Sequence, residues 1–206
     1  MKHILDQRKI PKVQVERAIG PILGLFIEEL LSKALKDKLV MICAEFPLRK
    51  STAGSNQSTN IDWLLYSKRN CQLVFVELKT TGVFNRAQFD RYCQVIRSVK
   101  GSAEHLLADV LEIRKHSAQK AKYDELIKLI RGTPFSDCRK AKLVYIMPEV
   151  PAPGIRVDGV ELDWLRLCDL EVREDFRFAR EWKVIHERLA AFGSRSKSKM
   201  GSNGTA

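Results

Sequence analysis

Two short apolar runs joined by a polar turn, in residues 61–78, constrain the fold of this chain more than any other feature of its sequence. Residues 61–66 read IDWLLY and residues 73–78 read LVFVEL, and both runs are rich in aliphatic and aromatic residues that favour strands. The polar residues 67–70, SKRN, lie between them and favour a turn. We therefore predict a β-hairpin, whose two strands run antiparallel.

Helical and strand patterns alternate on both sides of this hairpin. Apolar residues recur at helical spacing in residues 13–36 and again in residues 85–99, where Asn85 is the expected N-cap. Residues 40–46, VMICAEF, form a short strand-like run, and the Gly, Ser and Asn content of residues 50–59 predicts a loop. The first half of the chain is therefore predicted to run helix, strand, hairpin, helix.

The second half is predicted to add helices and at least one more strand. Residues 101–141 contain one or two amphipathic helices and are interpreted as an added helical segment. Residues 142–147, KLVYIM, are strand-like and end at Pro148. A further hairpin is expected around residues 156–162, and a closing helix over residues 175–192.

The expected organisation is one mixed α/β domain. Residues 1–192 are long enough for a single core. Residues 193–206, GSRSKSKMGSNGTA, carry almost no core-forming side chains and are predicted to be a flexible basic tail.

The composition indicates which binding partners and which cellular location to expect. The 36 Lys and Arg against 25 Asp and Glu give a formal charge of +11, which suits a nucleic acid backbone, although a basic protein without such a partner carries the same charge. The five cysteines are far apart and include no CxxC pair, so we expect reduced thiols.

No apolar run approaches the roughly 18 residues of a membrane span, and the first residues lack an apolar signal core. We expect a cytoplasmic protein with no membrane partner.

Asp62, Glu77 and Lys79 are the candidate functional residues of the hairpin. Glu77 and Lys79 end the second strand and share one face, because strand side chains alternate with a period of two. Asp62 opens the first strand, and in an antiparallel hairpin this end lies beside the end that carries Glu77. Two carboxylates and a lysine are sufficient to hold a hard cation and to position water for phosphodiester hydrolysis. A Glu-x-Lys triplet alone is usually a structural ion pair at the end of a strand.

These residues and the order of elements resemble the PD-(D/E)xK nuclease superfamily. The resemblance implies a restriction-endonuclease-like core of order α-β-β-β-α-β, with a central mixed sheet flanked by helices. It implies that Asp62 and Glu77 hold Mg²⁺ or Mn²⁺ and that the Leu78 carbonyl completes the coordination. It also implies that Lys79 positions the attacking water and stabilises charge. Ile61 stands here where the family commonly has a proline before the aspartate.

Two flanking helices extend the resemblance. Glu28 resembles the first-helix glutamate of the superfamily, in a Gly24-x-x-x-Glu28 setting. We prefer it to Glu29 because the residues three and four positions from Glu28 predict that it faces the core. Gln88 and Tyr92 resemble the QxxxY motif of RecB-like and lambda-exonuclease-like members. Residues four apart share a helix face, so both can point towards the metal site or DNA; an ordinary amphipathic helix also contains this spacing.

The sequence therefore predicts a Mg²⁺-dependent deoxyribonuclease, and the resemblance covers roughly residues 20–147. The predicted site contains Glu28, Asp62, Glu77, Lys79 and Gln88. An alternative is a catalytically silent module that keeps the nuclease fold for DNA binding or assembly. A third is an RNA-directed enzyme or a small-molecule-binding protein in which the triplet is accidental. DNA is the expected partner, with a partner protein or a second copy of the chain as further possibilities.

Overall fold

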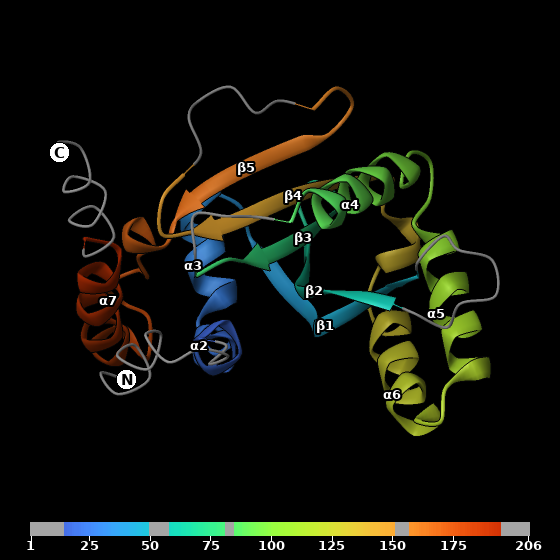
Figure 1. Cartoon of the computed structure of the whole chain (residues 1–206), viewed down its shortest axis with the longest axis horizontal. Coiled ribbons are helices and arrows are strands. Elements are labelled where there is room, and N and C mark those ends of the chain that lie inside the picture. Colours follow the sequence, from blue (N-terminus) through green and yellow to red (C-terminus); the bar gives the residue numbers. More distant parts are fainter. Residues whose placement is uncertain (1–14, 50–57, 81–84, 151–156, 195–206) are drawn as a thin grey trace, which may run out of the picture.

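The structure is a computed structural model that describes residues 15–49, 58–80, 85–150 and 157–194 of the chain. Its described residues form a five-stranded sheet in the order β1-β2-β3-β4-β5, with helices on both faces (Figure 1). This arrangement confirms the predicted mixed α/β class. No helix within the described ranges is long and apolar enough to cross a membrane.

The sheet changes from antiparallel to parallel pairing at its middle strand. The strands are β1 (Leu39–Arg49), β2 (Ser58–Ser67), β3 (Gln72–Leu78), β4 (Lys140–Met147) and β5 (Glu161–Arg166). β1, β2 and β3 pair antiparallel, whereas β3, β4 and β5 pair parallel. The predicted hairpin is thus confirmed as β2 and β3. Every residue of β3 is buried, as expected of a central strand that is covered on both faces.

Helices cover the two faces of the sheet in two groups. They are α2 (Val15–Gly24), α3 (Ile27–Ala34), α4 (Arg86–Ser98), α5 (Glu104–His116), α6 (Lys120–Arg131) and α7 (Ala179–Ser194), with short 3-10 turns η2 (Phe135–Asp137) and η3 (Leu167–Asp169). One core lies under α4, α5 and α6 and includes Phe75. The other lies under α2, α3 and α7 and includes Val76. Phe75 and Val76 are neighbours on β3, so the alternation of strand side chains divides the two cores.

The helix predicted over residues 13–36 is interrupted, and its first two residues lie outside the described ranges. The backbone N–H groups of Leu25 and Phe26 bond the carbonyls three residues before them, which makes a tight turn between α2 and α3. Gly24 precedes this turn and is a weak helix former. A Cβ atom added at Gly24 would lie 3.2 Å from Trp63 Nε1, so the missing side chain also lets the backbone approach the sheet.

The hairpin predicted around residues 156–162 is wrong. β5 runs parallel to β4, and parallel neighbours cannot be joined by a tight turn. A turn is present at Asp158 and Gly159, where Val160 N bonds Val157 O at 3.0 Å, but it leads into β5 alone.

The remaining boundaries differ from prediction in smaller ways. The helical segment 101–141 does contain two helices, α5 and α6. The closing helix begins at Ala179 rather than at residue 175 and continues to Ser194. Most of the predicted loop over residues 50–59 and of the predicted tail lies outside the described residues, and Ser58 already belongs to β2.

Candidate active site at the ends of two strands

Asp62 and Glu77 meet at one end of the β2–β3 hairpin. Trp63 pairs with Val76, so Asp62 and Glu77 are the next residues along the same antiparallel register. Asp62 Oδ2 accepts a hydrogen bond of 2.6 Å from the backbone N–H of Leu78. The Asp62 carboxylate therefore accepts a backbone N–H at the end of the β2–β3 ladder, next to Glu77.

Three side chains hold the Glu77 carboxylate. Lys79 Nζ donates to Glu77 Oε1 at 2.6 Å, and Gln88 Nε2 donates to the same oxygen at 3.0 Å. The Tyr92 hydroxyl lies 2.9 Å from Glu77 Oε2 and can donate to it. Gln88 also connects its neighbours, because its Oε1 accepts from Lys79 at 3.3 Å and its Nε2 donates to the Tyr92 hydroxyl at 2.6 Å. The result is a closed polar network around one buried acid.

The environment of Glu77 opposes its ionisation. The residue is only 2% exposed, and burial raises the pKa of Glu77 to about 7, with the negative charge of Asp62 acting in the same direction. The Lys79 ammonium and the Tyr92 hydroxyl lower this pKa but do not offset the burial. Burial and the Glu77 charge in turn raise the pKa of Tyr92, which keeps its hydroxyl a hydrogen-bond donor.

Helix α4 positions Gln88 and Tyr92 in the polar network around Glu77. Asn85 begins the helix as its N-cap, because its side-chain oxygen accepts from Gln88 N at 3.1 Å. Phe89 and Ile96 are buried beneath the helix and fix its position against the sheet. Gln88 and Tyr92 are one helical turn apart, so the shared face predicted from their spacing points at Glu77.

Glu28 does not face the core as predicted. Its side chain is exposed, whereas Glu29 is 8% exposed and bonds Arg173 with both carboxylate oxygens. The turn between α2 and α3 explains the error, since it breaks the periodicity on which the choice depended and leaves Leu25 75% exposed.

Glu28 bonds the first strand of the sheet. Its Oε1 accepts from Met41 N at 2.7 Å, and Met41 pairs with Leu65. Leu65 is three residues from Asp62, or about 10 Å along a strand. The structure thus brings Asp62, Glu77, Lys79 and Gln88 together. It does not place Glu28 among them.

One strand residue near the site was not found from the sequence. Glu45 lies on β1 opposite Asp62, between the paired residues Ala44 and Phe46, and has a φ of +53°. A positive φ is uncommon outside glycine and often marks a functional region. No sequence pattern predicts a positive φ at Glu45. Glu45 Oε2 accepts from Asn60 Nδ2 at 3.2 Å, and the Tyr92 hydroxyl lies 2.9 Å from the Asn60 carbonyl oxygen. Hydrogen bonds therefore link β1 and β2 to the Tyr92 side of the network.

The oxygen donors at this site suit a hard divalent cation. The described residues do not bring three His, Cys, Asp or Glu side chains to one metal-binding position, so a third donor must come from elsewhere. The Leu78 N–H faces Asp62, and a residue in an antiparallel ladder points its N–H and its carbonyl to the same side. Asp62, Glu77 and the Leu78 carbonyl are then three oxygen donors, and Mg²⁺ commonly takes its remaining ligands from water. A cation would also relieve the repulsion between the two carboxylates.

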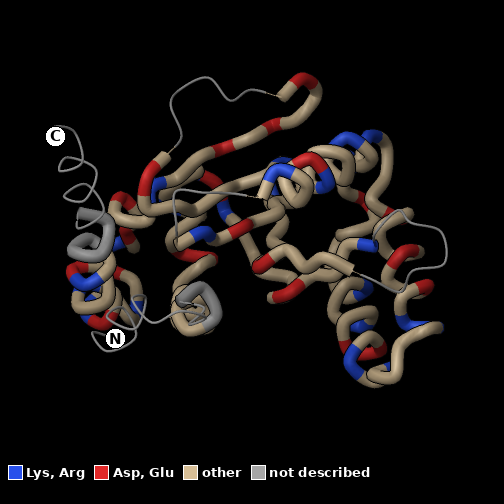
Figure 2. The backbone as a smooth tube through the Cα atoms, viewed as in Figure 1, with Lys and Arg blue, Asp and Glu red and all other residues tan. Residues whose placement is uncertain are grey.

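Helices α5 and α6 do not concentrate positive charge. Figure 2 shows Lys and Arg interspersed with Asp and Glu along α5 and α6, and ion pairs such as Arg114–Asp124 and Lys115–Glu112 join them. Nine of the 36 Lys and Arg, but only one of the 25 Asp and Glu, belong to the segments outside the described ranges. Those segments therefore carry most of the excess positive charge.

Comparisons of this chain with protein-family models, with curated proteins and with solved structures find no match.

Proposed function

We propose that this protein is a deoxyribonuclease that depends on Mg²⁺ or Mn²⁺ and has its site on the β2–β3 hairpin. The observation that carries the proposal is the meeting of Asp62 and Glu77 beside the Lys79 ammonium, 2.6 Å from Glu77. Two converging carboxylates at the end of buried strands are costly to maintain, and a cation site explains why they lie together.

The order of elements supports assigning a restriction-endonuclease-like core to α3, β1, β2, β3, α4 and β4. A helix is followed by three antiparallel strands, a second helix and a strand parallel to β3. In this assignment α5 and α6 are an insertion between the second helix and its strand.

The proposed roles follow from the contacts of each residue. Asp62, Glu77 and the Leu78 carbonyl would hold the cation. When bound, the cation neutralises charge on the scissile phosphate and makes a nearby water a stronger nucleophile. Lys79 reaches the same carboxylate and can orient that water. Gln88 bonds both Glu77 and Lys79, so it positions the two groups relative to each other.

A panel of DNA substrates tests this proposal. Supercoiled, linear, branched and single-stranded DNA are incubated with the protein in Mg²⁺, in Mn²⁺ and in EDTA. We expect cleavage with either cation and none in EDTA. Lys79→Ala should reduce cleavage by roughly 100-fold or more, whereas Lys128→Ala on the exposed surface of α6 should leave it unchanged. Undiminished cleavage by Lys79→Ala, or cleavage in EDTA, would exclude the proposed site.

A silent DNA-binding module is a second candidate, and one observation favours it. The Lys79 ammonium already pairs with Glu77, so the charge of the Glu77 carboxylate is compensated without a bound metal ion. The same panel separates the two functions, because a silent module would retard DNA equally in Mg²⁺ and EDTA and would cut none of the substrates.

A further inference from the structure

Two cysteines that are 67 residues apart in the sequence lie side by side at the start of β3 and β4. Cys71 Sγ is 3.9 Å from Cys138 Sγ. Cys71 is the last residue before β3, and Cys138 lies between η2 and β4. The parallel pairing of Gln72 with Lys140 brings the two segments together.

Backbone carbonyl groups orient both sulfur atoms. Cys71 Sγ lies 3.6 Å from the Asp137 carbonyl oxygen, and Cys138 Sγ lies 3.3 Å from that of Pro134. Cys71 also has a φ of +47°, in the left-handed region that non-glycine residues rarely adopt. The turn therefore holds the Cys71 side chain against the end of η2 and the segment that follows it, before β4.

The two thiols differ in access to solvent. Cys71 is exposed, whereas Cys138 is fully buried. Burial raises the pKa of Cys138 to about 12, with the neighbouring Cys71 acting in the same direction. A reagent in solution therefore meets Cys71 first, and Cys138 reacts only with a partner already held beside it.

We propose that Cys71 and Cys138 form a reversible disulfide that links the β2–β3 turn to the segment before β4. A disulfide places its sulfur atoms about 2.05 Å apart, so the present 3.9 Å must shorten by about 2 Å. Rotation of the two side chains about their Cα–Cβ bonds covers a distance of this size.

The oxidant is a low-molecular-weight disulfide such as oxidised glutathione. The Cys71 thiolate attacks one of its sulfur atoms, a mixed disulfide forms, and one glutathione thiolate leaves. Cys138 then gives up its proton and attacks the Cys71 sulfur, and the second glutathione thiolate leaves. The two cysteines lose two electrons and two protons, and the oxidant becomes two molecules of reduced glutathione.

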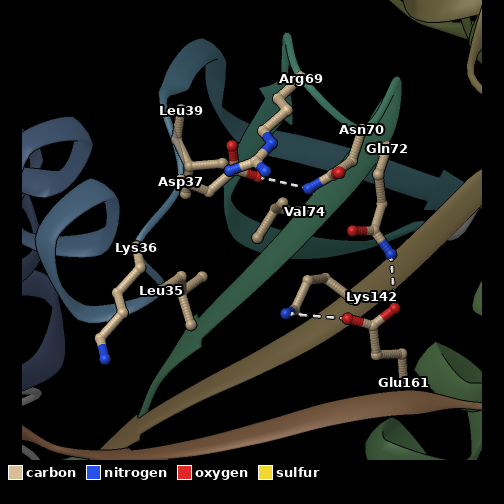
Figure 3. Close-up of a pocket in the computed structure, with 10 residues that line it drawn as sticks. All are labelled: Leu35, Lys36, Asp37, Leu39, Arg69, Asn70, Gln72, Val74, Lys142 and Glu161. Atoms are coloured by element: carbon tan, nitrogen blue, oxygen red, sulfur yellow. Dashed lines mark hydrogen bonds and ion pairs between the residues drawn. The ribbon is translucent and has the colours of Figure 1, made fainter.

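The cross-link would secure the end of the sheet that lies opposite the candidate active site. Glu77 is six residues from Cys71 along β3, or about 20 Å in a strand. Asn70 and Gln72 flank Cys71 in the sequence and line a polar cavity of about 290 Å³, where Asn70 Nδ2 bonds Asp37 and Gln72 Nε2 bonds Glu161 (Figure 3). A covalent bond here would fix the register of β3 against β4 without touching Glu77.

The test equilibrates the full chain in mixtures of reduced and oxidised glutathione and then alkylates the remaining thiols. We expect two of the five thiols to be lost, and peptide mapping to find Cys71 joined to Cys138. The closed loop is long, so oxidation should raise Tm by roughly 10 °C. Dithiothreitol should reverse both changes.

Three variants make the result specific. Cys71→Ser changes an exposed residue and should abolish the cross-link and the Tm shift. Cys138→Ala should do the same, and Cys168→Ser, at a half-buried position, should do neither. Five alkylated thiols after oxidation, a cross-link between other cysteines, or an unchanged shift in Cys71→Ser would overturn the proposal. None of these readouts depends on nuclease activity.

Discussion

Glu77→Gln is expected to stabilise the metal-free protein at alkaline pH. Each pKa unit corresponds to about 1.4 kcal/mol. A carboxyl group whose pKa rises from 4.5 when exposed to about 7 when folded therefore lowers the free energy of unfolding by about 3 kcal/mol once it is ionised. Glutamine keeps the shape of the side chain and never ionises, so the free energy of unfolding of the variant is not lowered in this way.

Because folding raises the pKa of Glu77, the contribution of this residue to stability depends on pH. Below the usual pKa of 4.5, Glu77 is protonated in both states and its burial carries no ionisation cost. As the pH rises, the unfolded chain releases its proton first, so the wild type loses stability until Glu77 ionises in the folded state near pH 7. The variant and the wild type should therefore differ little at about pH 4 and differ fully at about pH 8.5.

Urea unfolding in EDTA, followed by far-UV circular dichroism, measures this difference at both pH values. Glu29→Gln is the matched control with the opposite sign. Its hydrogen bonds to Arg173 lower the pKa of Glu29, so the ionised form stabilises the fold at neutral pH and that stability is lost as the pH falls. A Glu77→Gln variant that is less stable than the wild type at about pH 8.5, or a difference that is the same at both pH values, would refute the reasoning.

Three further substitutions test the packing and the network by the same urea unfolding assay. Tyr92→Phe removes a donor to Glu77 and should lower stability by about 1–3 kcal/mol, with a smaller loss when Glu77 is protonated. Asn85→Ala removes the N-cap of α4 and should cost about 1 kcal/mol, while Asn85→Asp should restore most of it. Phe89→Ala empties a fully buried position against Tyr145 and should cost about 3–5 kcal/mol, whereas Leu129→Ala on the exposed surface should change stability by less than about 0.5 kcal/mol.

The sequence predicts best those features that depend on residues close together along the chain. Asp62 and Glu77 could be expected to meet because one short turn joins their strands. Gln88 and Tyr92 could be expected to share a face because four residues make about one helical turn. The buried centre of β3 is likewise visible in the sequence as four consecutive apolar residues, 73–76.

Features that depend on distant residues or on a local break were not predictable in the same way. The prediction that Glu28 rather than Glu29 faces the core was wrong, because the turn at Leu25 and Phe26 shifts which side of α3 faces the sheet. The contact between Cys71 and Cys138 depends on the pairing of β3 with β4, and 67 residues separate the two cysteines. The parallel direction of β5 depends on where the chain re-enters the sheet, which no local pattern specifies.

The change from antiparallel to parallel pairing at β3 has a consequence for the order of folding. The antiparallel half joins β1, β2 and β3 through neighbouring segments, whereas β4 reaches β3 only after α4, α5 and α6. Closing a long loop costs more entropy than closing a short one, so contacts between near neighbours form faster. We therefore expect the β2–β3 hairpin, with Asp62 and Glu77 already adjacent, to precede the docking of β4. Until β4 arrives, one edge of β3 remains open to water, and the two acids can meet before the chain has to bury them.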